Sequence, residues 1–520
     1  MVEYQSYFYP IFTNMSKVVI ILFCFIAPFR VFSQVMPKEG SLLNYRIIGF
    51  SFPQVPVANK YKIEIAKGNH NRIDSFTKNI VVTGSTKKNR IIAEVPSFGS
   101  QYTWRIVSTK KKKNNNTPLY HFSTLMNDHV DTNKLHLRVL QPAAEKYKDY
   151  YVSVDAGGVL YDMTGKPVWF IPDTNGIGGY VADLKFTTQG TITFLYKQAY
   201  EIDYNANILW KAPNKGEISQ DTSGEFYHHE FTRLFNGHYM VLGMQVLMCR
   251  PVSANDSNYI IAAAQTKAQQ GYRKGRFGTI IEYDEQGNVV WSWKALNYLQ
   301  HSDVGYYNGS DSGVKYDPHD NAFYFDENNK WVYLGFRNLN RILKIEYPSG
   351  KILRTYGEVF QPRGLEEVGS LFCNQHSINR TQDGYLYVYN NNSCGHVDSL
   401  PTVVIIEEPE LQGGAIKKIW QYTTTIDSVN LQGYRKQFGS GGNAIELPDR
   451  SFFVDMGSDY SKLFIVNREK KELWSALPER FLETDQKWAA IHEYRANIIS
   501  RKDLETLIWN AETSTTAGKK

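Results

Sequence analysis

The chain has few cysteines, and their spacing excludes a structural zinc site. Only 4 of its 520 residues are cysteine, and three of them are spread widely, at positions 249, 373 and 394. Structural zinc needs thiolates at short, paired spacing, which these positions do not offer. An oxidising compartment permits one disulfide, and Cys373 with Cys394 is the predicted pair because they flank the strands of one repeat. Cys249 is then expected to be a free thiol.

Motifs of nucleotide and metal enzymes are also missing. No P-loop occurs, and no GxGxxG segment follows a strand-like stretch, so neither a nucleotide donor nor another cofactor is expected. No HExxH or similarly tight spacing of histidines occurs, and no metal ligands are assigned. The formal net charge is only +6, much of it in Lys110–Lys113, so no nucleic-acid partner is expected.

Long hydrophobic runs are absent apart from one near the N-terminus, which is too short to span a membrane comfortably. Lys17 precedes the apolar run Val18–Ala27, and Val31–Ser33 offers small residues at the spacing of a cleavage site. These features predict an extension and export signal over residues 1–33, with an uncleaved anchor as the alternative. The mature chain is expected to be periplasmic or otherwise exported, with no stable membrane partner.

Residues 35–127 are predicted to form a small all-β domain. Six stretches alternate apolar and polar residues in the manner of strands: Tyr45–Phe52, Lys60–Ala66, Lys78–Thr83, Arg90–Val95, Gln101–Val107 and Tyr120–Thr124. Short strands at regular spacing favour a β-sandwich of the fibronectin-III or immunoglobulin kind. This domain carries no catalytic constellation and is expected to be structural.

From residue 137 onward the chain repeats a unit that begins with a histidine. The clearest copies begin at His229, His319 and His376, and each runs through a strand, a turn and a second aromatic-rich strand. Turn dipeptides between alternating runs are the strongest local hairpin signal. A second signature is a hairpin whose last strand holds a tryptophan, as at Trp169, Trp210, Trp291, Trp420 and Trp474.

The two signatures together give four-stranded units, which is the layout of a propeller blade. The predicted fold class is therefore all-β, with a six-bladed β-propeller over residues 137–520 after the sandwich domain. The expected opening strands lie near Val181, His229, His319, His376 and Asn443; the sixth blade is assembled from residues 137–171 and completed by Glu493–Ile499 with Thr506–Trp509. The insertion Val246–Phe277, rich in Ala, Gln and Lys, is predicted to be partly helical, as a lid over one face.

The three histidines are expected to meet at one mouth of the channel, because equivalent positions of a closed repeat converge on its axis. A lone histidine there is most simply a polar group bonded to loop backbone. Three at one repeat position instead favour a functional site, since titratable groups gathered in a cleft mark such sites. Arg337 has a planar fork that suits sulfate or phosphate oxygens, unless it pairs with a surface carboxylate; Arg363 is a weaker candidate.

Four short motifs resemble the bacterial arylsulfate sulfotransferases, a family that does not use PAPS. They are Tyr227-His-His-Glu, Pro318-His-Asp-Asn-Ala-Phe, Gly335-Phe-Arg and Asn374-Gln-His-Ser. The resemblance covers nearly the whole mature chain. It implies an exported enzyme with a six-bladed propeller after a small sandwich, which moves a sulfuryl group from a phenolic sulfate to a phenol by a ping-pong reaction. Because the family includes dimers, a homodimer stands among the expectations.

The resemblance also implies a role for each site residue. His376 matches the nucleophile that becomes a sulfohistidine, and His229 and His319 match two assisting histidines. Arg337 matches the arginine that binds the sulfate, and Asn321 matches a sulfate-contacting asparagine. His228 adjoins His229; the repeat register favours His229, and His228 is kept as a substrate-binding candidate. The family's short-loop disulfide before the nucleophile is not reproduced.

Two other functions compete with this hypothesis. The histidines could serve a metal-dependent hydrolase, since three imidazoles suit zinc. The chain could instead be a propeller that binds a ligand without catalysis.

Overall fold

The computed structural model describes residues 35–517 except 57, 111–112, 174–176, 178–179, 214–225, 251–260, 264–271, 300–313, 358–370, 395–398, 409–415 and 428–437. Within these ranges the chain is nearly all β. No described helix is long and apolar enough to cross a membrane. The predicted export signal, residues 1–33, lies outside the described part of the chain.

The strands before residue 125 form two sheets. The larger contains, in order, β1 (Ser41–Leu43), β8 (Tyr120–Thr124), β6 (Gln101–Lys110), β3 (Lys60–Lys67) and β4 (Ile80–Thr86), with β7 (Lys113–Asn116) beside β6. The smaller pairs β2 (Ile47–Ser51) with β5 (Arg90–Glu94). All six predicted strands are confirmed to within three residues at either end. The short helix α1 (Ile73–Lys78), which buries Phe76, has no counterpart in the prediction.

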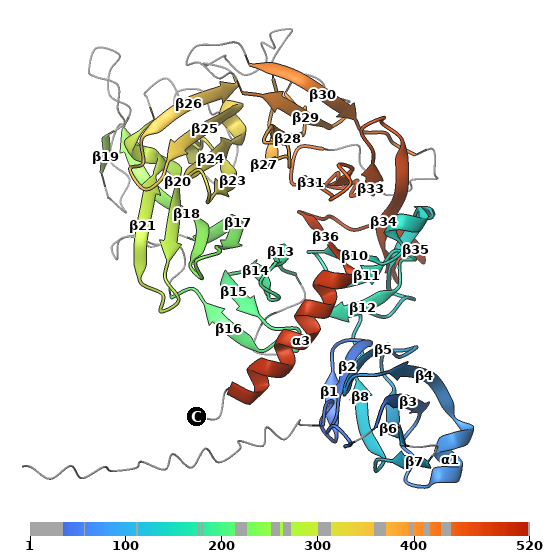
Figure 1. Cartoon of the computed structure of the whole chain (residues 1–520). Coiled ribbons are helices and arrows are strands. Elements are labelled where there is room, and N and C mark those ends of the chain that lie inside the picture. The colour runs from blue at the N-terminus through green and yellow to red at the C-terminus, as the bar shows by residue number, and fades with distance from the viewer. Residues whose placement is uncertain are drawn as a thin grey trace, which may run out of the picture.

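Six antiparallel sheets, each built on four strands, follow one another around a common axis (Figure 1). From the axis outward, the first contains β36 (Ala496–Ser500), β10 (Tyr150–Val154), β11 (Val159–Asp162) and β12 (Pro167–Phe170). The second contains β13 (Ala182–Phe186), β14 (Ile192–Tyr196), β15 (Gln198–Ile202) and β16 (Ile208–Lys211). The third contains β17 (Phe226–Arg233), β18 (Tyr239–Arg250), β20 (Arg273–Tyr283) and β21 (Val289–Lys294), with β19 (Ile261–Ala263) on β18 and β22 (Val314–Tyr316) on β20.

The remaining three sheets have the same plan. The fourth contains β23 (Asp320–Asp326), β24 (Trp331–Phe336), β25 (Arg341–Glu346) and β26 (Ile352–Gly357). The fifth contains β27 (His376–Arg380), β28 (Leu386–Asn390), β29 (Thr402–Glu407) and β30 (Lys417–Thr423). The sixth contains β31 (Asn443–Glu446), β32 (Phe452–Asp455), β33 (Leu463–Val466) and β34 (Glu472–Leu482), and β34 also pairs with β35 (Lys487–Ala490) and β9 (Leu135–Gln141). Each inner strand begins within three residues of its predicted start.

Two parts of the predicted first unit lie elsewhere. Strand β9, expected in the first sheet, pairs with β34 of the sixth sheet. Glu493–Ile499 does complete the first sheet through β36, but Thr506–Trp509 is helical, within α3 (Arg501–Ala517). The buried residues of α3 are Leu504, Leu507, Ile508 and Ala511, whose spacing is that of one helix face. Ser500 and Asp503 bond reciprocally at its start as a capping box, a signal present in the sequence.

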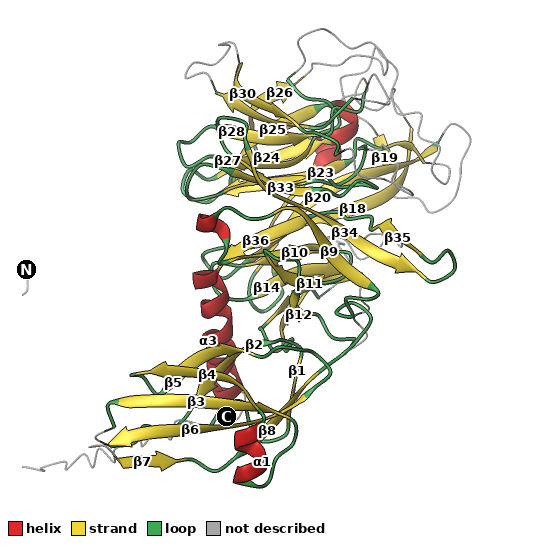
Figure 2. Cartoon of the chain, turned by 90° about the vertical axis from the view of Figure 1, so that its right-hand side faces the viewer, coloured by secondary structure: helices red, strands yellow, loops and turns green. Residues whose placement is uncertain are grey.

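Helix α3 joins the ring of sheets to the N-terminal strands (Figure 2). A Cβ at Gly49 in β2 would lie only 2.7 Å from side-chain atoms of Ile508 and Glu512, so glycine allows this close approach. Arg90 of β5 stacks over Trp509, 4.9 Å from the ring centroid. The C-terminus therefore connects the two groups of sheets that the sequence analysis assigned to separate domains.

The insertion Val246–Phe277 is not helical where it is described. Strand β18 continues to Arg250, and β20 begins at Arg273, so the two strands extend as a long ribbon that carries β19. Hydrogen bonds between the paired strands satisfy the backbone N–H and C=O groups of this segment, so it does not need to be helical. The rest of the insertion lies outside the described residues.

Tryptophans on the outer strands tie one sheet to the next. The indole of Trp169 in β12 donates to Tyr204 O at 2.8 Å, in the β15–β16 turn of the second sheet. Trp291 and Trp420 make the same bond to the outer turns of the fourth and sixth sheets, at Pro348 O and Arg468 O. Trp474 of the sixth sheet donates to Met163 O of the first at 3.1 Å. The repeated tryptophan is therefore a contact between sheets.

Replacing Trp474 by phenylalanine should weaken the junction between the last sheet and the first. The change keeps an aromatic ring at a fully buried position but leaves the carbonyl of Met163 without its indole donor. We expect the free energy of unfolding to fall by about 1–3 kcal/mol, the usual effect of orphaning a buried polar group. Guanidinium denaturation of Trp474→Phe measures this loss. Trp488→Phe, in edge strand β35, is the control, and an equal loss there would contradict the assignment.

Candidate functional site

The three predicted histidines meet at the axis of the ring. The rings of His229 and His319 lie 5.2 Å apart between centroids, in an edge-to-face arrangement. Tyr494, just before β36, lies 5.3 Å from the His229 ring and 6.2 Å from the His376 ring. Four rings from four different sheets thus surround one point.

The repeat suggested that the three histidines occupy equivalent positions, but in the structure they do not. Counted back from the last pair of each inner hairpin, His229 precedes Arg233 by four residues and His376 precedes Arg380 by four. In the fourth sheet the residue four before Asp326 is Ala322, so His319 lies three residues earlier, outside β23. Its ring reaches the site from the preceding loop.

Each of these inner strands has a β-bulge near its first residues. The pairing register shifts between Tyr227 and Phe231, between Asp320 and Ala322, and between His376 and Ile378. His229 and His319 have positive φ angles, 60° and 58°, which non-glycine residues rarely adopt. Bulges of this kind re-aim side chains and are common beside active sites. They turn the histidines toward the axis.

His376 is held as one tautomer of the neutral imidazole. It is 1% exposed, and its Nδ1 lies 2.7 Å from Asn391 Oδ1. The Asn391 amide nitrogen donates to Phe438 O and Gly441 O, which fixes its oxygen toward the histidine. Nδ1 must therefore carry the proton, and Nε2 keeps its lone pair, which the Gly441 N–H approaches at 3.3 Å. Burial and the positive charge of Arg337 hold the pKa of His376 well below its usual range.

One loop, residues 438–442, links Arg337 to His376. Arg337 begins the 3-10 turn η3 (Arg337–Leu339), and its Nε and terminal nitrogen donate to Gly439 O at 3.1 and 2.6 Å. Gly441, two residues on, contacts His376. A Cβ at Gly441 would lie 2.5 Å from Tyr494 O, and its φ of +66° suits glycine. The guanidinium and the nucleophilic nitrogen are thus placed by the same loop. Arg363, the other arginine considered, lies outside the described residues.

His228 supports His229 from behind. Its Nε2 lies 3.1 Å from Gly243 O, a carbonyl that can only accept, so Nε2 carries the proton. The lone pair of His228 Nδ1 then faces His229 Nδ1 at 2.5 Å, and His229 is the donor of that bond. Burial lowers the pKa of His228 to about 4 and also holds that of His229 well below its usual range. In the neutral pair, His229 keeps its Nε2 lone pair for the site.

His319 is oriented by a buried carboxylate. Its Nδ1 lies 3.5 Å from Asp317 Oδ2, and Asp317 is 3% exposed. Arg276 of β20 approaches the same oxygen at 3.7 Å. Asp317 lies two residues before His319 in the sequence, whereas Arg276 is distant in sequence and is brought beside them by the fold.

Asn321 is fully buried, and most of its hydrogen-bonding groups face the protein. Its side-chain Nδ2 donates to the backbone carbonyl of Gln375, directly before His376, at 2.8 Å. Its backbone carbonyl accepts from the Arg495 guanidinium at 3.0 Å. Its Oδ1 has no hydrogen-bond partner among the described residues. An acceptor cannot bind sulfate oxygens, so only the second amide hydrogen is left for such a ligand. Direct sulfate contact by Asn321 stays a prediction.

Tyr494 is the site residue that the sequence analysis missed. Its hydroxyl is buried without a partner among the described residues, and burial raises its pKa far above the usual range. No local motif marks this tyrosine. The stretch Glu493–Ile499 was recognised only as the one that closes the ring.

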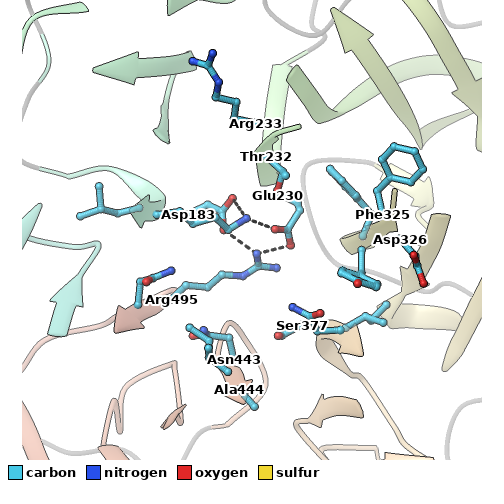
Figure 3. Close-up of a pocket in the computed structure, with 18 of the residues that line it drawn as sticks. Asp183, Glu230, Thr232, Arg233, Phe325, Asp326, Ser377, Asn443, Ala444 and Arg495 are labelled. Carbon is cyan, nitrogen blue, oxygen red and sulfur yellow. Dashed lines mark hydrogen bonds and ion pairs between the residues drawn. The ribbon is translucent and has the colours of Figure 1, made fainter. Parts of the chain in front are cut away.

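A cluster of ion pairs includes Glu230 and Arg495, the residues that follow His229 and Tyr494 in the chain (Figure 3). Arg495 bonds to Asp183 at 2.7 Å and also to Glu230, and Lys185 bonds to the same two carboxylates. A cavity of about 480 Å³ is lined by these four residues and by other inner-strand residues, not by the histidines. Among the described residues, no group of three or more His, Cys, Asp or Glu side chains is arranged to hold a metal ion.

The disulfide Cys373–Cys394 is confirmed, with the two Cα atoms 5.9 Å apart. It joins the segment before His376 to the segment after Asn391. Asn374 adds a bond from its Nδ2 to Ser393 Oγ at 2.9 Å. The disulfide therefore braces His376 and its orienting partner against each other. The side chain of Cys249 lies outside the described part.

Replacing Asn391 by aspartate should raise the pKa of His376. A carboxylate at Asn391 Oδ1, 2.7 Å from Nδ1, favours the imidazolium, and opposite charges at such distances shift pKa values by about 1 to 3 units. NMR titration of protein labelled with ¹⁵N-histidine measures the change. Asn379→Asp is the control, because Asn379 has no bond to His376. An unchanged His376 titration in Asn391→Asp would contradict the tautomer.

Comparisons with known proteins identify the family. The family model "Arylsulfotransferase (ASST)" matches residues 106–403, and no curated protein matches the chain. Similar solved structures include a protein of unknown function from Bacteroides caccae (13% identity, 68% of this chain and 99% of that one, TM-score 0.38) and a protein from Lactobacillus plantarum (11%, 85% and 100%, 0.33). These scores are too low to support an argument. By the match of the family model, which spans more than half of it, the chain belongs to the arylsulfotransferase family.

Proposed function

We propose that this protein moves a sulfuryl group from a phenolic sulfate to a phenol through a sulfohistidine on His376. The observation that carries the proposal is the tautomer of His376, whose Nε2 lone pair lies beside Tyr494 and within the field of Arg337. We also interpret the six sheets as the blades of a β-propeller, residues 137–520, and the strands of residues 35–127 as a β-sandwich domain.

In the first half-reaction Nε2 of His376 attacks the sulfur of the aryl sulfate. The N–S bond forms as the S–O bond to the aryl group breaks, and the leaving phenolate takes a proton from His319. Asp317 orients His319 for this transfer. Asn391 keeps the Nδ1 proton of His376 in place throughout, so the imidazole ring remains the nucleophile without a separate base.

The second half-reaction reverses the roles. The phenol acceptor gives its proton to His319, its oxygen attacks sulfur, and the N–S bond breaks to restore neutral His376. His229, held by His228, offers the lone pair of its Nε2 as a second proton acceptor beside His319. Because His228 and His229 are buried and neutral, they add no positive charge that would repel His319 when it becomes an imidazolium.

Charge on the sulfuryl oxygens is met by donors at one side of the site. Arg337 provides the positive charge, and the Gly441 N–H, which faces Nε2 in the free protein, can turn to a sulfuryl oxygen once nitrogen is bonded to sulfur. The Tyr494 hydroxyl is a third donor. We assign Asn321 to positioning, since it bonds the backbone next to His376.

The chemistry needs no nucleotide donor, and the partners are small phenolic molecules. We further propose that the chain is exported, on the basis of residues 1–33 and the disulfide.

The decisive assay supplies 4-nitrophenyl sulfate with a second phenol, without added metal or nucleotide. Acceptor-dependent release of nitrophenol supports transfer. Loss of activity with a chelator would favour a metal-dependent hydrolase, and no turnover a ligand-binding protein.

His376→Ala should abolish covalent labelling by the donor. With the nucleophilic nitrogen gone, incubation with aryl sulfate should no longer add a sulfuryl group, as intact-protein mass spectrometry measures. His136→Ala, which removes a histidine in β9 that contacts Glu479, should label like the parent protein. Labelling that persists in His376→Ala would exclude this nucleophile.

The donor half-reaction should tolerate acid unusually well for a histidine enzyme. Only neutral His376 can attack, and its pKa is well below the ordinary histidine value of about 6.5. We expect kcat/KM for the donor to stay level as pH falls through about 6.5 and to decline only in more acid solution. Asn391→Asp should move this decline to higher pH. A decline centred near the ordinary histidine value in the parent protein would contradict the assignment.

A further inference from the structure

Two buried carboxyl groups meet where the chain closes its ring. Asp155 directly follows β10, and Glu493 lies just before Tyr494 and β36; they are 1% and 0% exposed. Glu493 Oε2 accepts the N–H of Ala156, the residue after Asp155, and Asp155 Oδ1 accepts the N–H of Tyr494, the residue after Glu493. The two carboxyl groups therefore lie side by side and are hydrogen-bonded to each other. Two carboxylate oxygens can make such a contact only if one of them carries a proton. One of these two groups is therefore an acid in the folded protein.

The surrounding donors place the proton on Glu493. Asp155 accepts three backbone N–H groups, from Tyr494 at 3.1 Å, from Arg495 at 2.9 Å and from Asp183 at 3.4 Å. Glu493 accepts only one, from Ala156 at 2.9 Å, and no N–H group of the described residues donates to its Oε1. More N–H donors stabilise the charged form, so Asp155 is the anion and Glu493 donates from Oε1. Burial raises the pKa of Glu493 well above its usual range.

We propose that Asp155 and Glu493 share one proton and act as positioning residues, which fix the turn that places Tyr494 between His229 and His376. This inference rests on the proposed function, because it assigns Tyr494 to the transfer site. The carboxyl pair itself touches no substrate. It holds the backbone of Tyr494 and Arg495. The Tyr494 ring lies beside the histidines, and the Arg495 side chain belongs to the ion cluster.

The shared proton makes this turn sensitive to alkaline pH. Once Glu493 ionises, two carboxylates face each other in a buried space, and no cation bonds directly to either in the described structure. The charged or titratable groups that face the pair are Asp455, Asp183, Arg495, Tyr161 and Tyr494. An acid whose folded pKa is raised weakens the fold as pH rises from its unfolded pKa to its folded pKa. We therefore expect loss of the site on the alkaline side.

The two amide substitutions separate this arrangement from general packing. In Glu493→Gln, the amide nitrogen can donate permanently to Asp155 while the oxygen still accepts from Ala156. In Asp155→Asn, an amide NH₂ replaces an oxygen and faces a backbone N–H of Tyr494 or Arg495. We expect Glu493→Gln to keep kcat within about twofold at neutral pH and to flatten the alkaline limb of the kcat profile, and Asp155→Asn to lose at least about tenfold in kcat.

A double-mutant cycle tests whether the effect passes through Tyr494. Asp155→Asn should cost little further kcat in a Tyr494→Ala background, since the side chain that it positions is already gone. Glu282→Gln, at another fully buried glutamate, is the matched control and should leave the alkaline limb unchanged. Additive losses in the cycle, or an alkaline limb unaltered in Glu493→Gln, would overturn the proposal.

Thermal unfolding provides a readout that needs no turnover. The unfolding temperature of the parent protein should fall with rising pH relative to that of Glu493→Gln, and the two should converge in acid. If no transfer occurs in the parent protein, the proposed function fails, while these melting curves still test the shared proton. Parallel curves at every pH would exclude it, even where Asp155→Asn does not fold.

Discussion

The pairing of β36 with β10 is the contact on which the site depends. It joins residues 496–500 to residues 150–154 over five consecutive positions and so brings the C-terminal strand into the first sheet. The inner strands can face a common axis only when that ring is complete, and Trp474 adds a bond between the sixth sheet and the first. Tyr494 and Arg495 lie directly before this strand and reach the axis beside it. The pairing of β36 with β10 therefore also places these two residues.

Burial allows three imidazoles to share a small space. Charged histidines this close would repel one another, but desolvation disfavours the cationic forms of His229 and His376. Hydrogen bonds then fix the neutral rings, as Asn391 and Gly441 do at His376. The positive φ angles of His229 and His319 cost about 1 kcal/mol each, and the surrounding sheets offset that strain.

The ion cluster beyond the histidines has the opposite character. Arg495, Asp183, Glu230 and Lys185 are all charged but mutually paired, so their burial leaves no charge without a partner. They come from β13 and β17 and from the residue before β36, and hold the inner edges of three sheets together. A rigid cluster of paired charges of this kind supports the histidine rings, which therefore keep their orientation.

Local sequence determined the strands, the turns and the outer tryptophans. Alternation gave the inner strands to within three residues, and the side chains of Asp203 and Asp284 stabilise the predicted turns by accepting backbone N–H groups two and four residues on. The position of helix α3 was also encoded, in the spacing from Leu504 to Ala511, although Thr506–Trp509 was predicted to complete a blade. These features depend on neighbours in the chain, which is why they can be inferred without the fold.

The family motifs also indicated His229, His319, His376 and Arg337 from sequence alone. Only the tertiary structure decided how they are used. The loop at Gly439–Gly441 joins Arg337 to His376, and the Gly243 carbonyl holds His228 while the His229 ring lies beside His319 and Tyr494. Tyr494, Asp155, Glu493 and Asn391 gave no signal, because their partners lie far away in sequence. The contacts of Tyr494, Asp155 and Glu493 form where β36 joins the first sheet, and that of Asn391 forms where β27 pairs with β28; no local pattern encodes either pairing.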